Sequence, residues 1–332
     1  MTGHRTGILA TGSYVPKEEV SNEEIASRVG VTAEWIERKT QIRSRRFAAP
    51  DEATSDLAVR AATAALEQAR LAPEEIDYII LSTSTGDFPQ PPTSYLVQDA
   101  LGAHNAACFD INVVCSGFVY ALALARSLVD QRPEARALVI GADLYSRILD
   151  FTDRKTAVLF ADGAGAAVVG SVPEPYGITA LELASRGDAH GLIRVEAGGS
   201  RNPATAETVA EGGHFFRMDG RGVRDFVTEH VPPALRRLAD DAGVPLSEVD
   251  HFVPHQANGV LLGEVVERAG LTNAVTHRTL RQFGNVGSAS VPLALDEANR
   301  SGALKDGDLV LLAGFGGGMA LGSALLRWAV TA

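Results

Sequence analysis

Two kinds of apolar pattern alternate along the chain. Thr54 to Arg70 is rich in alanine and leucine, has Ser and Thr near its start, and predicts a helix. Tyr78 to Ser82 is a short apolar run that predicts a buried strand. Ala107 to Val114 predicts the next strand, and Ser116 to Val129, with small residues along one side, predicts the next helix. Alternating strands and helices indicate an α/β fold in which helices pack on sheets.

The chain also matches itself at a single offset of 173 residues (250 − 77 = 173). The ungapped matches place Asp77 on Asp250, Asn112 on Asn285, and Gly141 on Gly314. A unit of about half the chain is too long for a solenoid repeat, so we interpret the chain as two fused copies of one domain, residues 1–172 and 173–332. Ligands in α/β folds gather where strands end and helices begin, so polar residues at those ends are the first candidates for chemistry.

Composition narrows the classes of function. Hydrophobic residues make up 45% of the 332 positions and charged residues 21%, which is typical of a globular protein and excludes a disordered or fibrous one. The net charge of −11 gives no general attraction to nucleic acid or anionic lipid, so neither is expected as a partner. One cluster of basic residues either binds phosphate groups or forms a solvated face of the protein. Its members are Arg38, Lys39, Arg43, Arg45 and Arg46.

Neither export nor a membrane span is expected. The first residues contain no apolar run of signal-peptide length, which favours a cytoplasmic protein. Leu309 to Leu326 carries no charge over 18 residues, but five glycines interrupt it. That run therefore predicts two buried strands around a glycine turn.

Cys115 is the first candidate for chemistry. It lies between a predicted buried strand, Phe109 to Val114, and a helix of small residues that begins at Ser116. The N–H groups at a helix N-terminus stabilise a thiolate, which lowers the cysteine pKa, and they can hold an oxyanion during acyl transfer. The alternative is an inert core cysteine. The only other cysteine is Cys108, so no disulfide framework or metal cage is expected.

His255 and Asn285 occupy comparable positions in the second copy. His255 follows the strand His251 to Pro254, where the first copy has Ser82, and Asn285 opens the loop GNVGSAS. A pseudo-twofold relation between the copies would bring both residues to Cys115. The alternatives are a histidine bonded to a backbone carbonyl and an asparagine that turns a loop. The glycine clusters near Gly165 and Gly316 lack the pattern of a dinucleotide site; close backbone packing is favoured, and an N–H near Gly316 is a candidate oxyanion donor.

Five motifs in this order and spacing resemble the β-ketoacyl-acyl-carrier-protein synthase III family of the thiolase superfamily. They are DINVVCSGF, DGAGAAV, VPHQAN, GNVGSAS and GFGGG. The resemblance spans the chain from the first strand to the last. It implies a thiolase-like, five-layered αβαβα fold, a homodimer, and an active site made of Cys115, His255 and Asn285.

The same resemblance implies the reaction and its contacts. Members of the family load an acyl group from acyl-CoA onto the cysteine and condense it with a malonyl thioester, usually on an acyl carrier protein, with loss of carbon dioxide. No metal or other cofactor takes part. By resemblance the oxyanion hole is formed at Cys115 and Gly316, and Trp35 and Arg154 bracket the adenine of coenzyme A. Phe88, reaching across the dimer, and Phe315 would line the acyl pocket.

Four positions depart from the family pattern. The segment that usually reads TGIR is Thr40-Gln-Ile-Arg43, and the small, alanine-rich residues that usually precede the nucleophile are replaced by Val113-Val114. The Leu-Arg that often follows HQAN is replaced by Gly259-Val260, and the loop that usually reads GNTS is Gly284-Asn-Val-Gly287. The predicted function is condensation in fatty acid, polyketide or other secondary metabolite synthesis. The alternative is a non-elongating acyltransferase that passes the acyl group from Cys115 to a hydroxyl or amine. A degradative thiolase would carry a second cysteine in the last glycine loop, and a silent partner subunit would lack Cys115.

Overall fold

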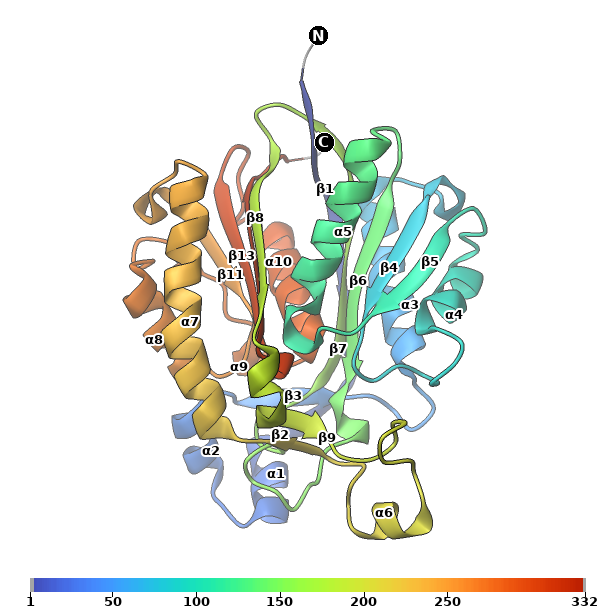
Figure 1. Ribbon diagram of the computed structural model, residues 1–332, viewed down its shortest axis with the longest axis vertical. Helices are drawn as coiled ribbons and strands as arrows, with labels where there is room; N and C mark the ends of the chain where they lie inside the picture. The colour runs from blue at the N-terminus through green and yellow to red at the C-terminus, as the bar shows by residue number, and fades with distance from the viewer. Residues whose placement is uncertain (1–2, 331–332) are drawn as a thin grey trace.

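The computed structural model describes residues 3–330 and contains two five-stranded mixed sheets (Figure 1). The first has the order β1-β7-β6-β4-β5. Its strands are β1 (His4–Tyr14), β4 (Tyr78–Ser82), β5 (Ala107–Ile111), β6 (Ala137–Leu144) and β7 (Asp162–Pro173). The second has the order β12-β11-β13-β14-β8. Its strands are β8 (Gly177–Ser185), β11 (His251–Pro254), β12 (Val275–Thr276), β13 (Leu309–Gly316) and β14 (Ala320–Arg327).

Each sheet draws its strands from one of the two predicted copies, and the orders correspond strand for strand. In the first sheet, β5-β4 and β4-β6 are parallel pairs, and β6-β7 and β7-β1 are antiparallel. In the second sheet, β12-β11 and β11-β13 are parallel pairs, and β13-β14 and β14-β8 are antiparallel. The uncharged run is two strands, β13 and β14, joined by a turn at Gly317–Met319, as predicted. Of the described residues, none belongs to a helix that is long and apolar enough to cross a membrane. The placement of a domain boundary after residue 172 stays a prediction.

Helices form three layers around the sheets. The bounds are α1 (Asn22–Val29), α2 (Ala33–Thr40), α3 (Thr54–Ala69), α4 (Thr93–Leu101), α5 (Gly117–Gln131), α6 (Ala206–Ala210), α7 (Gly220–Asp241), α8 (Gly259–Ala269), α9 (Leu280–Phe283) and α10 (Ser290–Arg300). Helices α5 and α10 lie between the sheets, α3 and α4 cover the outer face of the first sheet, and α7 and α8 cover the second. This is the five-layered αβαβα arrangement that the resemblance implied.

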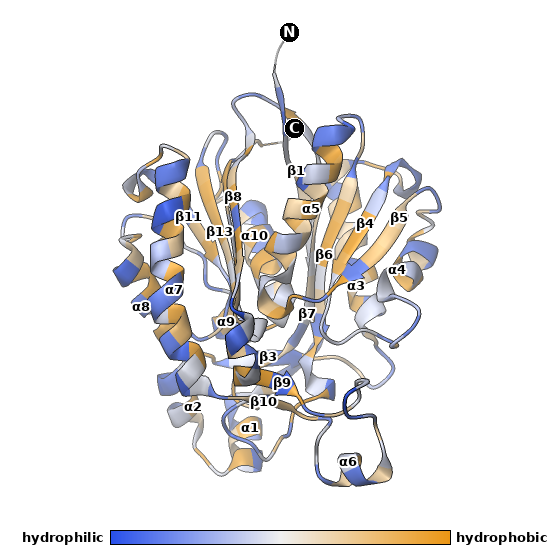
Figure 2. Ribbon diagram, viewed as in Figure 1, coloured by the Kyte–Doolittle hydropathy of each residue, from blue (hydrophilic) through white to orange (hydrophobic). Residues whose placement is uncertain are grey.

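The patterning of the sequence explains the layers. Both sheets are largely hydrophobic in Figure 2, whereas the outer helix α7 alternates hydrophilic and hydrophobic residues along its length. The central layer is packed from small and branched side chains such as Ala121 and Ala294, which let α5 and α10 fit between two sheets. Two small hairpin-like sheets, β2 (Glu18–Ser21) with β3 (Ser44–Phe47) and β9 (Ile193–Val195) with β10 (Phe216–Met218), lie at one end of the layers.

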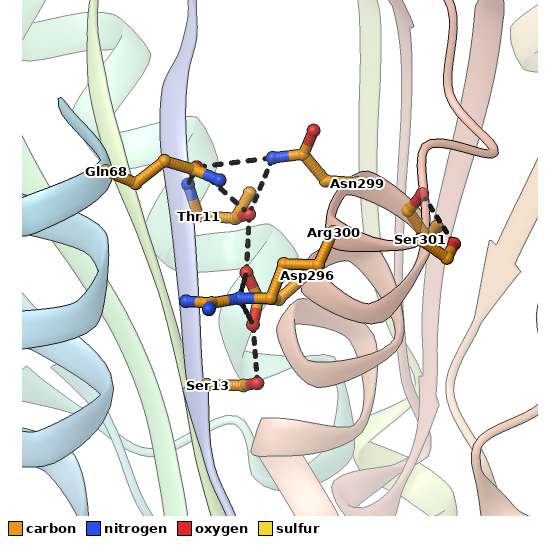
Figure 3. Close-up of polar contacts among 8 residues, drawn as sticks. Thr11, Ser13, Gln68, Asp296, Asn299, Arg300 and Ser301 are labelled. Carbon is orange, nitrogen blue, oxygen red and sulfur yellow. Dashed lines mark hydrogen bonds and ion pairs between the residues drawn. The ribbon is translucent and has the colours of Figure 1, made fainter.

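A buried polar network ties the two halves together away from the loops that carry Cys115 and Asn285. Asp296 on α10 is fully buried and accepts hydrogen bonds from Thr11 Oγ1 (2.7 Å) and Ser13 Oγ (2.6 Å) on β1 (Figure 3). Arg300, one turn further along α10, pairs with both carboxylate oxygens at 3.0 and 2.8 Å. A buried carboxylate is tolerated here because its oxygens are paired.

Candidate active site

The nucleophile candidate lies at a sharp turn after β5. The strand ends at Ile111 and not at Val114 as predicted, because the side chain of Asn112 accepts a hydrogen bond from the N–H of Val114 (3.3 Å) and turns the chain. Val114 adopts a left-handed φ of 46°, which is unusual for a β-branched residue. Cys115 follows in a short 3₁₀ turn, and α5 begins at Gly117. The strand itself is half-buried, since β5 is an edge strand.

The thiol of Cys115 is protonated in the resting site. Its residue is only 5% exposed. The pKa of Cys115 is raised to about 12: burial is the largest cause, hydrogen bonds from the backbone at Gly317 and Cys115 oppose it, and the charge of Asp143 adds to it. The expectation that the helix N-terminus lowers this pKa is therefore wrong. The backbone N–H groups do lower it, but desolvation of the thiolate raises it by more, so the pKa lies above its ordinary value. The thiol needs a base.

His255 is suited to be that base. It follows β11, and its N–H donates to the carbonyl of Ala313 on β13 (2.7 Å). Burial lowers the pKa of its imidazole to about 3, and a hydrogen bond with the backbone of Gly287 opposes this shift. The ring is therefore neutral at physiological pH and has a free nitrogen for the thiol proton, and the thiolate and imidazolium that form in this buried site stabilise each other by their opposite charges. Phe315 holds it in an edge-to-face contact with 5.7 Å between ring centroids.

Asn285 presents an amide N–H₂ group. Its backbone N–H donates to Leu159 (2.9 Å), and its carbonyl accepts from Ala161 (2.8 Å), so the second half of the chain is anchored to the first. Its side-chain Oδ1 accepts from the N–H of Gly287 (3.0 Å). With Oδ1 used in this way, Nδ2 is the side-chain atom left to donate to a ligand.

One cavity of about 530 Å³ collects nearly all of the predicted site residues. Its lining includes Cys115, His255, Asn285, Phe315, Gly316, Trp35 and Arg154. Gly316 has a φ of 139°, and a Cβ there would lie 3.4 Å from Cys115 Sγ, so its backbone stands directly beside the thiol. Phe88 is not part of this lining and is 58% exposed; its predicted role requires a second subunit and stays a prediction.

The residues of the basic cluster differ in their surroundings, so neither phosphate binding nor a solvated face describes all of them. Arg45 is fully buried and donates to the side chain of Asn22 (2.9 Å), so it is a structural residue. Arg43 and Arg46 form exposed ion pairs with Glu37 and Glu19. Of the cluster, Lys39 lines the cavity.

Two departures from the family pattern form a single packing feature. Gln41, where the glycine of TGIR is expected, adopts a left-handed φ of 62° at the end of α2. A Cβ added to Gly259 would lie 2.5 Å from Gln41 Oε1 and 2.7 Å from its Cβ. The side chain of Gln41 thus fills the space over Gly259, and its Oε1 accepts from Arg278 Nη1 (3.2 Å). A larger residue at 41 accompanies a smaller one at 259.

Much of the cavity wall escapes sequence analysis. Apolar residues of the segment from β9 to α7 contribute to it, and no motif distinguishes them from core residues. They are Ile193, Met218, Val223 and Val227. Across residues 3–330 there is no group of three or more His, Cys, Asp or Glu side chains that could hold a metal ion.

Comparison with known proteins identifies the family. The family model described as 3-oxoacyl-[acyl-carrier-protein (ACP)] synthase III matches residues 109–187, and its C-terminal counterpart matches residues 239–328. Together these matches cover the turn of Cys115 and the loops of His255 and Asn285. The chain belongs to the ketoacyl synthase III family of the thiolase superfamily.

Individual relatives match this chain along nearly its whole length. The chain is 51% identical to the acetoacetyl CoA synthase NphT7 of Streptomyces sp. (strain CL190), with 99% of this chain and 100% of the relative covered. It is 43% identical to a β-ketoacyl-[acyl-carrier-protein] synthase III of Caldanaerobacter subterraneus subsp. tengcongensis, with 97% of each covered. Among solved structures, the priming β-ketosynthase of the R1128 polyketide biosynthetic pathway superposes with a TM-score of 0.91 at 36% identity, covering 99% and 98% of the chains.

These findings confirm the predicted class of reaction. The chain is an acyltransferase of the ketoacyl synthase III kind, which takes up an acyl group and condenses it with a malonyl thioester. Non-elongating transfer to a hydroxyl or amine is not favoured by these relatives.

Proposed function

We propose that Cys115 carries the acyl group. The observation that supports this most directly is that one cavity is lined by Cys115, His255, Asn285 and Gly316 together. The Cys115 thiol gives its proton to the neutral His255 and attacks the acyl-CoA carbonyl. The oxyanion is held by the N–H groups at Cys115 and Gly316, coenzyme A leaves as its thiol with the proton from His255, and the acyl group remains as a thioester on Sγ.

The second half-reaction uses the same cavity. His255, now as the neutral tautomer whose cavity-facing nitrogen carries the hydrogen, and Asn285 Nδ2 donate hydrogen bonds to the carbonyl of the malonyl thioester. As the carboxylate leaves as carbon dioxide, these donors stabilise the enolate. The enolate carbon attacks the acyl-cysteine, the new carbon–carbon bond forms, and Cys115 leaves as a thiolate that takes up one proton. Thiol, imidazole, amide and backbone N–H groups suffice for these steps without a metal or another cofactor.

The substrates are coenzyme A thioesters. Trp35 is half-buried and Arg154 is exposed on the lining of the cavity, which supports stacking of both on the adenine of acyl-CoA. We propose malonyl-CoA as the acceptor in place of a malonyl carrier protein. The position after Gly259, where the family has a docking arginine, is an exposed valine, Val260, and the relative from Streptomyces is named an acetoacetyl CoA synthase. Such thioesters and a reduced active-site thiol suit the cytoplasm.

The functional unit is a homodimer. Strand β5 is the edge of the first sheet, so one side of its backbone lacks a neighbouring strand in the described chain. Its side chains are half-buried, and Phe88 and Tyr95 nearby in sequence are 58% and 50% exposed. A second copy across this edge would cover these aromatic residues and bring Phe88 to the neighbouring acyl pocket.

The proposal is tested by product analysis. Wild-type protein is incubated with acetyl-CoA and either malonyl-CoA or a malonyl carrier protein, at low and high salt, and carbon dioxide and product mass are measured. We expect acetoacetyl-CoA, a slower reaction with the carrier protein, and a weak salt dependence. Discharge of the acyl group to an added alcohol or amine, without carbon dioxide, would contradict condensation. A steep loss of rate with salt would contradict the preference for free coenzyme A thioesters.

A further inference from the structure

A second buried carboxylate lies beside the site and has no part in the reaction proposed above. Asp143, on β6, is fully buried. Its Oδ1 accepts hydrogen bonds from the backbone N–H and the hydroxyl of Ser84, both at 2.8 Å. Its Oδ2 accepts from the backbone N–H (2.7 Å) and the hydroxyl (2.8 Å) of Ser288. One carboxylate therefore joins a loop of the first half to the loop that follows Asn285 in the second half.

The internal duplication explains this position. At the offset of 173 residues, Asp143 corresponds to Gly316 (316 − 143) and Ser288 to Cys115 (288 − 115). Gly287 likewise corresponds to Val114, and both have a left-handed φ, 57° and 46°. The N–H of Ser288 is thus the counterpart of the oxyanion-hole N–H at Cys115. By this correspondence, the Asp143 oxygen that accepts from the N–H of Ser288 is the counterpart of the oxyanion that we propose for the first site.

The loop held by Asp143 is the loop that orders both proposed donors. Gly287 packs so closely on the carboxylate that a Cβ there would collide with Asp143 Oδ2. The N–H of Gly287 donates to Asn285 Oδ1 (3.0 Å), which sets the direction of the amide. The backbone of Gly287 also lies close enough to the imidazole of His255 to raise its pKa against the effect of burial. One glycine therefore connects Asp143 to both side chains.

We propose that Asp143 is a positioning residue for decarboxylation: by clamping Ser288 and Gly287 it aims Asn285 and His255 at the malonyl thioester. This inference rests on the roles proposed above for His255 and Asn285. Catalytic groups that are displaced by about 1 Å lose on the order of a hundredfold in rate. Loading uses His255 only as the acceptor of the thiol proton and does not use Asn285, whereas decarboxylation needs both side chains aimed at one carbonyl, so loading is less sensitive to this loop.

The test compares Asp143→Asn with a matched control. The amide preserves the shape of the side chain but has only one oxygen, so its N–H₂ group faces the donors of either Ser84 or Ser288. We expect kcat for carbon dioxide release from malonyl-CoA to fall about a hundredfold, with KM changed less than about twofold and acyl loading, followed by intact mass, retained within about fivefold. Asp296→Asn is the control, because Asp296 is equally buried and also joins the two halves (Figure 3) but contacts neither loop.

The outcomes separate a positioning role from a structural one. If Asp143→Asn releases carbon dioxide at the wild-type rate, or if both variants lose loading and decarboxylation in equal proportion, the inference is overturned. If Asp143→Asn does not fold, Ser288→Ala replaces it, because this variant removes one hydroxyl donor to Asp143 and keeps the backbone N–H. A selective loss of decarboxylation in Ser288→Ala supports the inference. Decarboxylation at the wild-type rate overturns it. Failure of the proposed function is distinguishable, because wild-type protein would then load an acyl group and release no carbon dioxide.

Discussion

Replacement of Asn285 by alanine separates the two half-reactions. The backbone of Asn285 is anchored by Leu159 and Ala161, so truncation of the side chain leaves the loop attached. The variant loses two things: the acceptor for the N–H of Gly287 and the Nδ2 donor that we assign to the malonyl carbonyl. Loading of Cys115 needs neither, so the acyl-enzyme should form.

The magnitudes differ for the two losses. Removal of one donor to a developing oxyanion costs about 3 kcal/mol in the transition state, or roughly 10²-fold in the rate of carbon dioxide release. Leaving the buried N–H of Gly287 unpaired costs stability, about 1–3 kcal/mol. Asn112→Ala is the control, because the side chain of Asn112 accepts the equivalent turn bond in the first copy (3.3 Å from the N–H of Val114) and is not part of the cavity lining.

The assay follows acyl-enzyme by intact mass and carbon dioxide by release from malonyl-CoA, with thermal unfolding alongside. We expect Asn285→Ala to acylate and to lose decarboxylation about 10²-fold, and Asn112→Ala to keep decarboxylation within about tenfold. The reasoning is refuted if Asn285→Ala decarboxylates malonyl-CoA at the wild-type rate, or if Asn112→Ala loses as much as Asn285→Ala.

Three further predictions concern the thiol, the packing departure and the nucleotide contacts. Because burial holds the pKa of Cys115 at about 12, the thiolate fraction and hence the rate of alkylation by iodoacetamide without substrate should rise about tenfold per pH unit from pH 6 to 9; a plateau near neutrality would contradict this. Gly259→Leu should destabilise the fold by about 1–3 kcal/mol, and Gln41→Gly in the same chain should recover part of that loss, giving a coupling of about 0.5–3 kcal/mol in urea unfolding, whereas additive effects would reject the shared packing. Trp35→Ala and Arg154→Ala should raise KM for acetyl-CoA but spare loading from a short acyl thioester without the nucleotide; equal damage with both donors would show that these side chains do not hold the nucleotide.

The regular elements were predictable where the sequence pattern is local. Tyr78–Ser82 is the predicted strand, and the helix predicted from Thr54 runs to Ala69, with Arg70 as its left-handed cap. The strand after Ala107 is shorter than predicted, because the chain turns where the side chain of Asn112 accepts a hydrogen bond from the N–H of Val114. Apolar character alone cannot reveal such a bond. The duplicated strand order likewise follows from a repeat visible in the sequence, but which helices lie between the sheets requires the packing.

The sequence predicted residues that line the main cavity, whose catalytic roles stay predictions, but it did not predict the electrostatics of that cavity. Strand ends in two related copies mark Cys115, His255 and Asn285, and one cavity collects them. The sign of the pKa shift of Cys115 was missed because desolvation is a tertiary property that residue spacing does not encode. Asp143 was also missed, although a signal exists: the repeat places an acidic residue opposite Gly316.

The most direct test of the account is a single-turnover chase of the acyl group. Protein labelled with isotopic acetyl-CoA is freed of excess donor, its adduct is mapped by peptide mass, and malonyl-CoA is added. The account predicts that the label sits on Cys115, that it leaves this residue when malonyl-CoA is added, and that it appears in acetoacetyl-CoA with one carbon dioxide released per label lost. Label on Cys108, or label that stays on Cys115 while carbon dioxide is released, would contradict the account.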